Sequence, residues 1–414
     1  MRVAIVTETY SPEINGVALT VAGLAHGLAQ AGHVVQLIRP RQEADSANAP
    51  AEPDIETQLV RGMRLPRYPG LQLGLPAGKR LRAMWRDVRP DAIYVATEGP
   101  LGWSALRIAR ALGIPASSGF HTRFDDFAAH YGFAALTPFV FAYLRRFHRL
   151  ATATFVPTVE LEDFLAASGF GNVVRLPRAV DTHLFDPSRR DEDLHASWCA
   201  GAGPAVIYVG RIAAEKNLPL AVRSFRALQR LHPDARYIWV GDGPARAALA
   251  AQNPDFIFAG VQRGESLARH FASADLFVFP SLTETFGNVT LEALASGVPT
   301  VAFDYGAARE YLGDSCGRRV AFARDDAMDA AGAFVAAVCD LAGDADALAA
   351  KRAAARQAVA MLDQRAVIAD FAHALAALGA PDRGQQEPPF RSEHDETRLD
   401  TIADRDAPLL RSAP

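Results

Sequence analysis

The residue types best suited to chemistry lie in the stretch 280–294, which reads PSLTETFGNVTLEAL. Two acids, Glu284 and Glu292, flank the pair Gly287 and Asn288, at which a helix is predicted to begin. Asn288 is of a type that caps helices well, and the free N–H groups of the first helical turn favour an anion such as phosphate. Because an ionised carboxylate offers two acceptor oxygens, each acid could also bind the neighbouring hydroxyls of a sugar.

The same acids also have a purely structural interpretation. Glu292 would stabilise the first helical turn through the helix dipole, and Glu284 would be an ordinary loop residue at the surface. Taken alone, the stretch leaves both interpretations open.

A second stretch, GRIAAEKN (210–217), places Arg211 and Lys216 directly after the apolar run AVIYV. Cations at the carboxyl end of a buried strand are well placed to bind a diphosphate, Arg through its planar fork and Lys as a point charge. A solvated basic loop is the alternative. Since both stretches follow strands of one predicted parallel sheet, they are expected at the same sheet edge, where ligands of open α/β folds bind.

Two successive series of strands and helices must position these residues. Buried parallel strands read as continuous apolar, β-branched runs, and helices follow them with a period near 3.6. The pattern predicts an α/β protein with two doubly wound, Rossmann-like domains that face a cleft. The first series has strands at 2–8, 33–40, 92–96, 114–120 and 151–158 and a helix at 17–32; the second has strands at 205–210, 236–241, 256–260, 276–281 and 299–304 and helices at 217–231, 267–274 and 288–297.

Composition divides the chain into five segments. Residues 1–180 are predicted to form an N-terminal domain, and the polar segment 181–203 is predicted to connect it to a C-terminal domain at 204–360. A helix at 361–380 is expected to return to the N-terminal domain. The tail 381–414 is charged and has few aromatic residues, so we expect it to be disordered.

Composition also disfavours several classes of protein. The net charge of the 414 residues is −4, which disfavours nucleic-acid binding through bulk positive charge. The cysteines Cys199, Cys316 and Cys339 form no C-x-x-C pair, so neither a disulfide framework nor a zinc site is predicted. The start reads as a strand rather than a secretory signal, and no apolar window is long enough to span a membrane. These features predict a cytoplasmic protein.

The motifs together resemble those of retaining glycosyltransferases of family 4, which have the GT-B fold. The matching patterns are G-R-x-x-x-E-K-N at 210–217, P-S-x-x-E-T-F-G-N-V-x-L-E-A-L-A-x-G-V-P-T-V at 280–301, TETYSPEINGV at 7–17 and GFHTRFDDF at 119–127. The resemblance covers about residues 1–375. It implies that the N-terminal domain, 1–180, receives the acceptor and that the C-terminal domain, 204–360, binds the nucleotide sugar. Within the family, the chain looks most similar to GDP-mannose-dependent α-mannosyltransferases and to the relatives of sulfoquinovosyl-diacylglycerol synthase, which act on lipid-linked acceptors.

The resemblance implies a role for each matched residue. Arg211 and Lys216 would neutralise the donor diphosphate, Glu284 would hold hydroxyls of the transferred sugar, Glu292 would bind the ribose, and His121 would face the sugar from the other domain. The remaining positions are backbone contacts: amides of Phe286, Gly287, Asn288 and Val289 to sugar and phosphate, Gly16 for the close approach of the N-terminal loop, Gly210 near phosphate, and the loop around Val261 near the base.

The resemblance also implies the type of reaction. The bond between an anomeric carbon and a phosphate oxygen breaks with retention of configuration, and the departing phosphate takes the acceptor proton. No protein carboxylate then acts as the nucleophile, so catalysis is electrostatic. No metal and no cofactor are expected, because the nucleotide sugar is a substrate.

Other motifs are weaker candidates. G-x-G at 241–243 has Arg246 where a dinucleotide fingerprint has its third glycine, which disfavours a nicotinamide site. The sequences DED (191–193) and DAD (344–346) match a metal-binding D-x-D, but they lie in polar or Ala-rich surroundings that favour a charged surface. Asp125 and Asp126 are more readily explained as solvated residues than as acceptor contacts.

Basic segments at 61–90 and 143–150 interleave cations with Trp85 and other apolar residues. They suit peripheral contact with an anionic leaflet at the inner face of the plasma membrane, but a solvated helix face explains them equally well.

The leading hypothesis is a retaining hexosyltransferase that moves mannose from GDP-mannose to a glycolipid or lipid-linked saccharide. The alternative within enzymes is a UDP-sugar-dependent glucosyl or sulfoquinovosyl transferase. Less favoured alternatives are a non-catalytic module that binds a sugar nucleotide and a sugar-nucleotide epimerase of the same fold.

Overall fold

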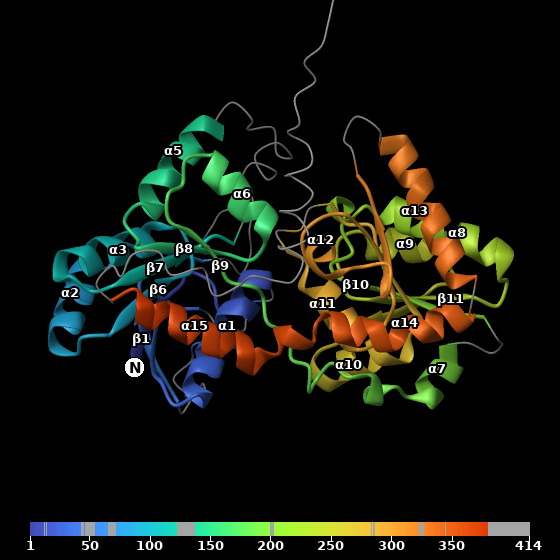
Figure 1. Cartoon of the computed structure of the whole chain (residues 1–414), viewed down its shortest axis with the longest axis horizontal. Helices are drawn as coiled ribbons and strands as arrows, with labels where there is room; N and C mark the ends of the chain where they lie inside the picture. The colour runs from blue at the N-terminus through green and yellow to red at the C-terminus, as the bar shows by residue number, and fades with distance from the viewer. Residues whose placement is uncertain are drawn as a thin grey trace, which may run out of the picture.

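The computed structural model describes residues 1–11, 13, 15–42, 45, 54–64, 72–121, 137–198, 203–282, 284, 286–322, 327–343 and 345–379. Two parallel sheets, each covered by helices, lie in two halves of the molecule (Figure 1). The strand order is β3-β2-β1-β6-β7-β8-β9 in the first sheet and β12-β11-β10-β13-β14-β15 in the second. These are the two doubly wound α/β units that the sequence predicts.

The first half contains strands β1 (Arg2–Val6), β2 (Val34–Pro40), β3 (Ile55–Val60), β6 (Ala92–Val95), β7 (Ala116–Gly119), β8 (Ala153–Val156) and β9 (Val173–Arg175). A short antiparallel pair, β4 (Gly62–Arg64) and β5 (Gln72–Gly74), lies outside this sheet. The helices of this half are α1 (Gly16–Gln30), α2 (Gly78–Asp87), α3 (Pro100–Leu112), α5 (Thr137–His148) and α6 (Val159–Ala167).

The second half contains β10 (Ala205–Val209), β11 (Arg236–Val240), β12 (Ile257–Gly260), β13 (Leu276–Phe279), β14 (Thr300–Phe303) and β15 (Gly317–Val320). Its helices are α7 (Glu192–Trp198), α8 (Leu218–Leu231), α9 (Arg246–Gln252), α10 (Gly264–Ser273), α11 (Asn288–Ala295), α12 (Ala307–Tyr311), α13 (Ala327–Ala342) and α14 (Ala345–Ala358). Short 3-10 turns are η2 (Pro187–Arg189), η3 (Ala214–Lys216) and η5 (Ala360–Leu362), and the last described helix is α15 (Gln364–Ala377).

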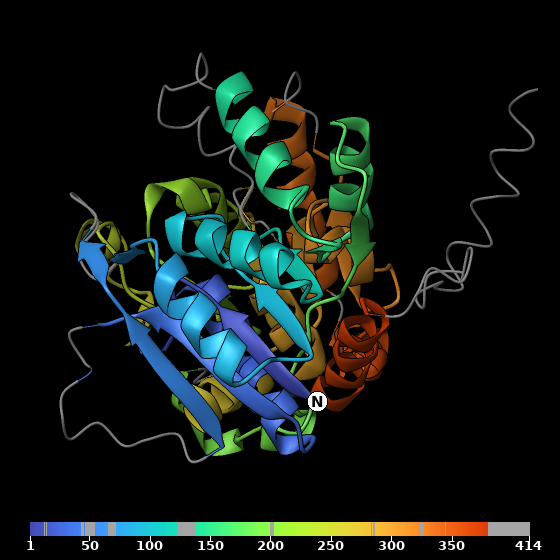
Figure 2. The same ribbon diagram turned by 90° about the vertical axis from the view of Figure 1, so that its left-hand side faces the viewer.

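Strand β1 shows why apolar runs become buried parallel strands. Successive side chains of a strand point to opposite faces, so Val3 and Ile5 pack with α1 and α15 while Ala4 and Val6 pack with α2 and α3. Figure 2 shows α2 and α3 over the sheet of this half. With both faces covered, every position of the strand after Arg2 is buried, which explains its unbroken apolar sequence.

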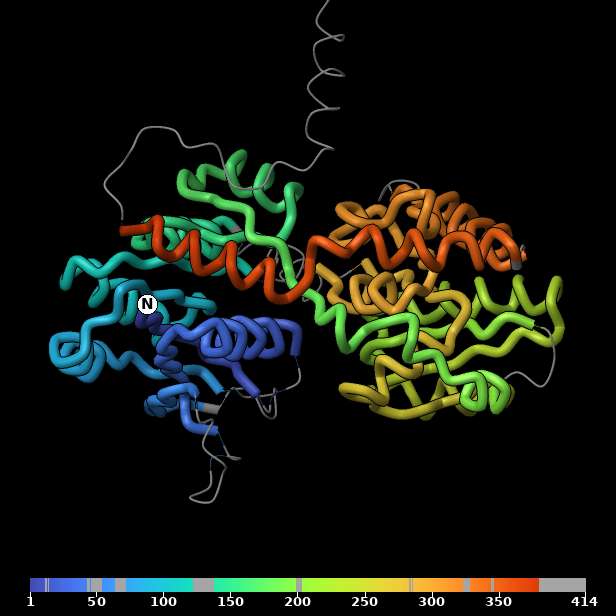
Figure 3. The backbone as a smooth tube through the Cα atoms, turned by 60° about the horizontal axis from the view of Figure 1, so that its bottom comes forward, coloured from blue at the N-terminus to red at the C-terminus, as the bar shows by residue number. Residues whose placement is uncertain are grey.

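The chain crosses between the halves twice at neighbouring places. The N–H of Val180 donates to the carbonyl of Leu362 at 2.9 Å, and Thr182 Oγ1 donates to Asp363 Oδ2 at 2.7 Å. In Figure 3 the two crossing segments pass side by side. Beyond the crossing, α15 lies on the first half, where Phe371 packs edge-on against Tyr94 at a centroid distance of 5.1 Å.

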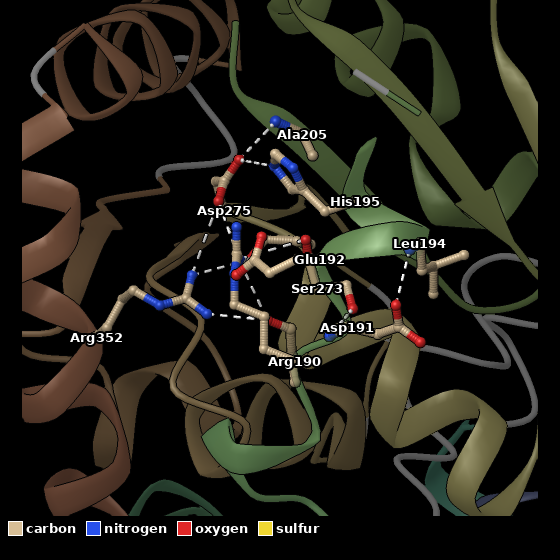
Figure 4. Close-up of polar contacts among 11 residues, drawn as sticks. Arg190, Asp191, Glu192, Leu194, His195, Ala205, Ser273, Asp275 and Arg352 are labelled. Carbon is tan, nitrogen blue, oxygen red and sulfur yellow. Dashed lines mark hydrogen bonds and ion pairs between the residues drawn. The ribbon is translucent and has the colours of Figure 1, made fainter. Parts of the chain in front are cut away.

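A half-buried polar cluster anchors the segment that enters the second half (Figure 4). Asp275, which precedes β13, accepts hydrogen bonds from Ala205 N at 2.9 Å and Arg190 Nη1 at 3.2 Å, and its other close partner is His195 Nε2 at 3.0 Å. Arg352 of α14 donates to the carbonyls of the turn before Asp275. The cluster therefore fixes α7 at the amino end of the sheet, opposite the edge predicted to bind ligands.

Several local expectations are wrong. The Ala-rich sequence at about 345–379 suggests one helical stretch, but the structure has two helices there, α14 and α15. The side chain of Asp363 accepts from Arg365 N and starts the second helix. Helix α13 was not predicted, and the pair β4–β5 lies inside the basic segment 61–90. Asp125, Asp126 and the tail 381–414 lie outside the described residues. Among the described helices, none combines the length and apolar character needed to span a bilayer.

Candidate active site

The predicted cation and the predicted sugar-binding acid of the second half meet. Lys216 Nζ donates to Glu284 Oε1 at 2.5 Å, and Ser281 Oγ donates to the same oxygen at 2.9 Å. Lys216 ends η3, which follows β10, and Glu284 follows β13. Since β10 and β13 are neighbours in the sheet, two residues 68 positions apart in the sequence share its carboxyl edge.

Arg211 lies in the same loop but reaches outward. Its side chain is 66% exposed, and its ion-pair partner is Glu215 at 3.5 Å. The hydroxyl of Tyr208, in β10, donates to the backbone carbonyl of Arg211 at 3.0 Å and so fixes the start of the loop. Gly210, with φ of 150°, makes the turn out of the strand. The guanidinium is therefore free of short contacts that would hold it away from a ligand.

The amino end of α11 differs from the expectation in one detail. Asn288 is the first residue of the helix rather than its cap. Gly287 occupies the cap position with φ of 89°, a left-handed conformation that favours glycine, so no side-chain oxygen satisfies the first amides. Phe286 before it is fixed by Ala307, whose N–H donates to the Phe286 carbonyl at 2.6 Å. The helix end thus remains able to bind an anion.

Glu292, one turn into α11, faces the space between the two halves. It lines a cavity of about 360 Å³ whose walls also include Asn288, Thr20 of α1, His121 and Ile368 of α15. Burial raises the pKa of the Glu292 carboxyl to about 7. No hydrogen bond or ion pair of this carboxyl is found among the described residues, so its acceptor oxygens are available to hydroxyl groups.

Gly16 begins α1 on the opposite wall. Asn15 caps the helix, because its Oδ1 accepts from Ala18 N at 2.8 Å, and its Nδ2 donates to Thr9 Oγ1 at 2.8 Å. A Cβ added at Gly16 would meet nothing within 4 Å, so the backbone faces open space, as the approach of a ligand requires.

His121 lines this cavity from the first half, although only 8% of the residue is exposed. Its Nε2 lies 2.7 Å from the hydroxyl of Tyr94, and its Nδ1 lies 3.0 Å from Nη2 of Arg178. Burial, followed by the positive charge of Arg178, lowers the pKa of His121 well below its usual value. The imidazole is therefore neutral, and both of its nitrogens have protein partners.

A pair of acids that the sequence analysis missed lies at the first sheet's carboxyl edge. Glu8 follows β1 and Glu98 follows β6, so they flank the point at which the strand order reverses. Glu8 Oε1 accepts from Leu101 N at 3.1 Å, and a Cβ at Gly99 would lie 2.0 Å from that oxygen. Burial and, more weakly, the charge of Glu98 raise the pKa of Glu8 to about 7. The available signal was position, since each acid directly follows a buried strand.

Family models match both halves of the chain. The model described as Glycosyltransferase Family 4 matches residues 14–184, and the model described as Glycosyl transferases group 1 matches residues 203–344. The chain is also 35% identical over 320 residues to a GDP-mannose-dependent alpha-mannosyltransferase of Mycobacterium tuberculosis (strain CDC 1551 / Oshkosh), which covers 75% of this chain and 81% of that protein. The chain belongs to glycosyltransferase family 4.

The chain is also similar to more distant glycosyltransferases whose names give other activities. A sulfoquinovosyl transferase of Arabidopsis thaliana is 33% identical over 249 residues, which is 58% of this chain and 48% of that protein. Among solved structures, sucrose-phosphate synthase from Thermosynechococcus elongatus superposes with a TM-score of 0.70 at 18% identity, over 90% of this chain and 98% of that chain. This similarity shows the fold, which is GT-B, as predicted.

The predicted site residues of this glycosyltransferase fall into three groups. Lys216 and Glu284 contact each other, and His121, Asn288 and Glu292 line one cavity between the halves. Val261, directly after β12, is 53% exposed at the carboxyl edge of the second sheet, and its role at the base stays a prediction. No group of three or more His, Cys, Asp or Glu side chains that could hold a metal ion occurs within the described ranges.

Proposed function

We propose that this glycosyltransferase transfers mannose from GDP-mannose, with retention of configuration, to a glycolipid or a lipid-linked saccharide. Three relatives that are 35–36% identical to the chain, from two mycobacteria and a corynebacterium, are named GDP-mannose-dependent alpha-mannosyltransferases. The single observation that carries the proposal is the contact of Lys216 with Glu284 at the sheet edge from which α11 also begins.

In the proposed reaction, the donor diphosphate lies between the cations after β10 and the amino end of α11. As the bond between the anomeric carbon and the phosphate oxygen breaks, the phosphate gains charge, and Lys216 and Arg211 stabilise it. The departing phosphate oxygen takes the proton of the acceptor hydroxyl, which attacks the same face of the sugar. Glu284, beside Lys216, accepts hydrogen bonds from hydroxyls of the sugar, and Glu292 accepts hydrogen bonds from the ribose.

This arrangement needs no metal ion, because the two cations and the free helix amides carry the positive charge that the leaving group requires. It also needs no cofactor, since the activated sugar is itself the substrate. Addition of a chelator is therefore expected to leave the transfer rate unchanged.

The second candidate is a UDP-sugar-dependent transferase. It is supported by the similarity to the sulfoquinovosyl transferase and by weaker similarity, at 27% identity, to an alpha-monoglucosyldiacylglycerol synthase of Acholeplasma laidlawii. A panel of GDP-mannose, UDP-glucose and UDP-GlcNAc in a thermal-shift assay separates the donors, because a ligand that binds only the native state raises its stability with increasing occupancy.

A transfer assay with the preferred donor and a bacterial lipid extract then tests the reaction. The proposal predicts release of nucleotide that depends on the lipid, and an α-linked hexose in the product by NMR. A non-catalytic module would bind the donor without releasing nucleotide, and an epimerase would convert it without an acceptor. Either result, or stabilisation by a UDP-sugar alone, would contradict the assignment to GDP-mannose-dependent transfer.

A further inference from the structure

Arg178 is a buried cation to which the sequence motifs assign no role. It follows β9 and is 7% exposed. Its Nη1 donates to Thr20 Oγ1 of α1, its Nη2 donates to Nδ1 of His121 at 3.0 Å, and its Nε has no partner. Within the part of the chain that the structure describes, no carboxylate pairs with it.

An unpaired buried guanidinium is unusual. Removing a charge from water is costly unless an opposite charge compensates it, and arginine is almost never fully buried without a partner. Burial lowers the pKa of Arg178 only to about 10, so the group remains charged at neutral pH. A ligand that brings negative charge to this place would supply the missing compensation.

The location of Arg178 identifies that ligand. Arg178 lines the same cavity as Asn288 and Glu292, at the amino end of α11. Its partner Thr20 is one helical turn from Gly16 and donates to the Gly16 carbonyl at 2.8 Å. The guanidinium thus belongs to the wall of a cavity that the amino end of α11 and the first turns of α1 also line, where the donor is proposed to bind.

We propose that Arg178 is a positioning residue for transfer: the guanidinium, buried in the cavity wall and bonded to His121 and Thr20 but to no carboxylate, fixes the His121 tautomer and directs positive charge toward the donor diphosphate. Only the second part of this inference, the role of Arg178 at the donor diphosphate, rests on the proposed function. The first part, the tautomer of His121, concerns the protein alone and can be tested without any donor.

The tautomer follows from the chemistry of the two partners. A guanidinium has only N–H groups, so Nδ1 of His121 must accept and cannot carry the proton. The proton is therefore on Nε2, which donates to the hydroxyl of Tyr94. A single tautomer in turn fixes the ring beside the cavity, whereas a free imidazole would exchange between two.

Nitrogen NMR of the imidazole groups tests the first part. In the wild type, His121 is expected to show a protonated Nε2 and a bare Nδ1 at mildly acidic and mildly basic pH alike. Arg178→Met, which keeps bulk and removes every N–H, should release the tautomer and raise the pKa of His121. Arg178→Lys, which keeps N–H donors and the charge, should restore the wild-type signals. An unchanged His121 spectrum in Arg178→Met would overturn this part.

Donor binding by calorimetry tests the second part. Arg178→Met is expected to weaken GDP-mannose binding roughly tenfold and to reduce its dependence on salt, while Arg178→Lys stays near the wild type. Arg352→Gln serves as the matched control, because Arg352 is a largely buried arginine bonded to backbone carbonyls that does not line the cavity. It should lower the melting temperature and leave donor affinity unchanged.

The outcomes separate the two proposals. If Arg178→Met only lowers the melting temperature, as Arg352→Gln does, and binds donor as the wild type does, Arg178 is a structural residue and the inference is wrong. If the wild type binds no sugar nucleotide at all, the proposed function is wrong. The part of the inference that assigns Arg178 to the donor diphosphate is then wrong as well. The His121 spectra still decide the tautomer in that case.

Discussion

Lys216 and Glu284 illustrate how one side-chain pair can serve both structure and chemistry. Their side chains are 17% and 20% exposed, so the pair is partly shielded but still accessible to a ligand. Lys216 has three N–H donors and uses one on Glu284, which leaves two for a phosphate. The lysine can therefore bind the leaving group while it holds the acid that positions the sugar.

Replacement of Lys216 tests this double role. Lys216→Ala should lower kcat about 100- to 1000-fold, the range found when one group that stabilises developing negative charge is removed. Arg318→Ala is a suitable control, because Arg318 is 44% exposed and pairs with Asp314 on the surface. Initial rates at saturating donor measure the effect, and equal rates in both variants would refute the assignment of Lys216.

The pKa of Glu292 gives a prediction about pH. Its pKa is about 7 in the native protein and near 4.5 when solvated, so between these values the native state binds more protons than the unfolded state. Stability therefore falls as pH rises through this window. Glu292→Gln removes the effect, and the variant should melt at a higher temperature than the wild type above pH 7 but not below about pH 4.5. It should also bind donor more weakly.

Melting curves over a pH series measure that difference directly. If the melting temperatures of variant and wild type differ by the same amount at every pH, Glu292 is not a buried carboxyl. Its assignment as the ribose-binding group of the cavity would then be wrong.

Single site residues can be predicted from the sequence when they belong to one motif with a characteristic spacing, as Lys216, Glu284 and Glu292 do. It does not reveal Arg178, Tyr94 or Glu98, because their partners come from distant segments. Arg178, for example, contacts residues 57 and 158 positions away, and no local pattern marks such a contact.

Among the elements, α6 and α12 join the two halves on the side of the cleft away from the chain crossing. Glu310 Oε1 of α12 accepts from Val159 N, the first amide of α6, at 3.1 Å, and Arg309 pairs with Glu160 at 3.1 Å. Because Ala307, the first residue of α12, donates its N–H to the carbonyl of Phe286, this contact links the position of the halves to the loop before α11.

Removal of this contact between α6 and α12 should allow the two halves of the molecule to move apart. Glu310→Gln combined with Arg309→Ala loses the charged cap and the ion pair, so the donor KM should rise several-fold while kcat changes little, as expected when ground-state binding is weakened. Small-angle scattering should show a larger radius of gyration. Unchanged scattering and an unchanged KM would show that this contact does not hold the halves together.

The elements themselves could be predicted where the pattern is strong. Strands β10 and β13 are apolar throughout and β1 is apolar after Arg2, so sequence alone identifies them. Helix α13 and the break at Asp363 were missed because alanine-rich sequence is compatible with a helix of any length and marks neither end. The β4–β5 pair has strands of three residues, which is too short for periodicity to show.

For the whole molecule, the distribution of charge on the first half predicts contact with anionic lipid. Helix α2 carries Lys79, Arg82 and Arg86 around the buried Trp85, and Phe139 of α5 is 74% exposed. Each cation near an anionic surface contributes about 1 kcal/mol, so binding to vesicles that contain anionic lipid should weaken with salt.

A vesicle sedimentation assay checks this contact. The combined change Arg82→Glu and Arg86→Glu should reduce binding to anionic vesicles and leave the lipid-free affinity for donor unchanged. Neutral vesicles are the control. If the wild type binds neutral and anionic vesicles equally, or neither, the basic face is only a solvated surface.

The central claim is that the carboxyl edge of the second sheet holds the terminal phosphate of the donor through Lys216. Calorimetric affinities of GDP and GMP for the wild type and for Lys216→Ala measure this contact most directly. The account predicts that the wild type binds GDP more tightly than GMP and that Lys216→Ala loses most of this difference. Equal affinities in the wild type, or a difference that survives the substitution, would contradict it.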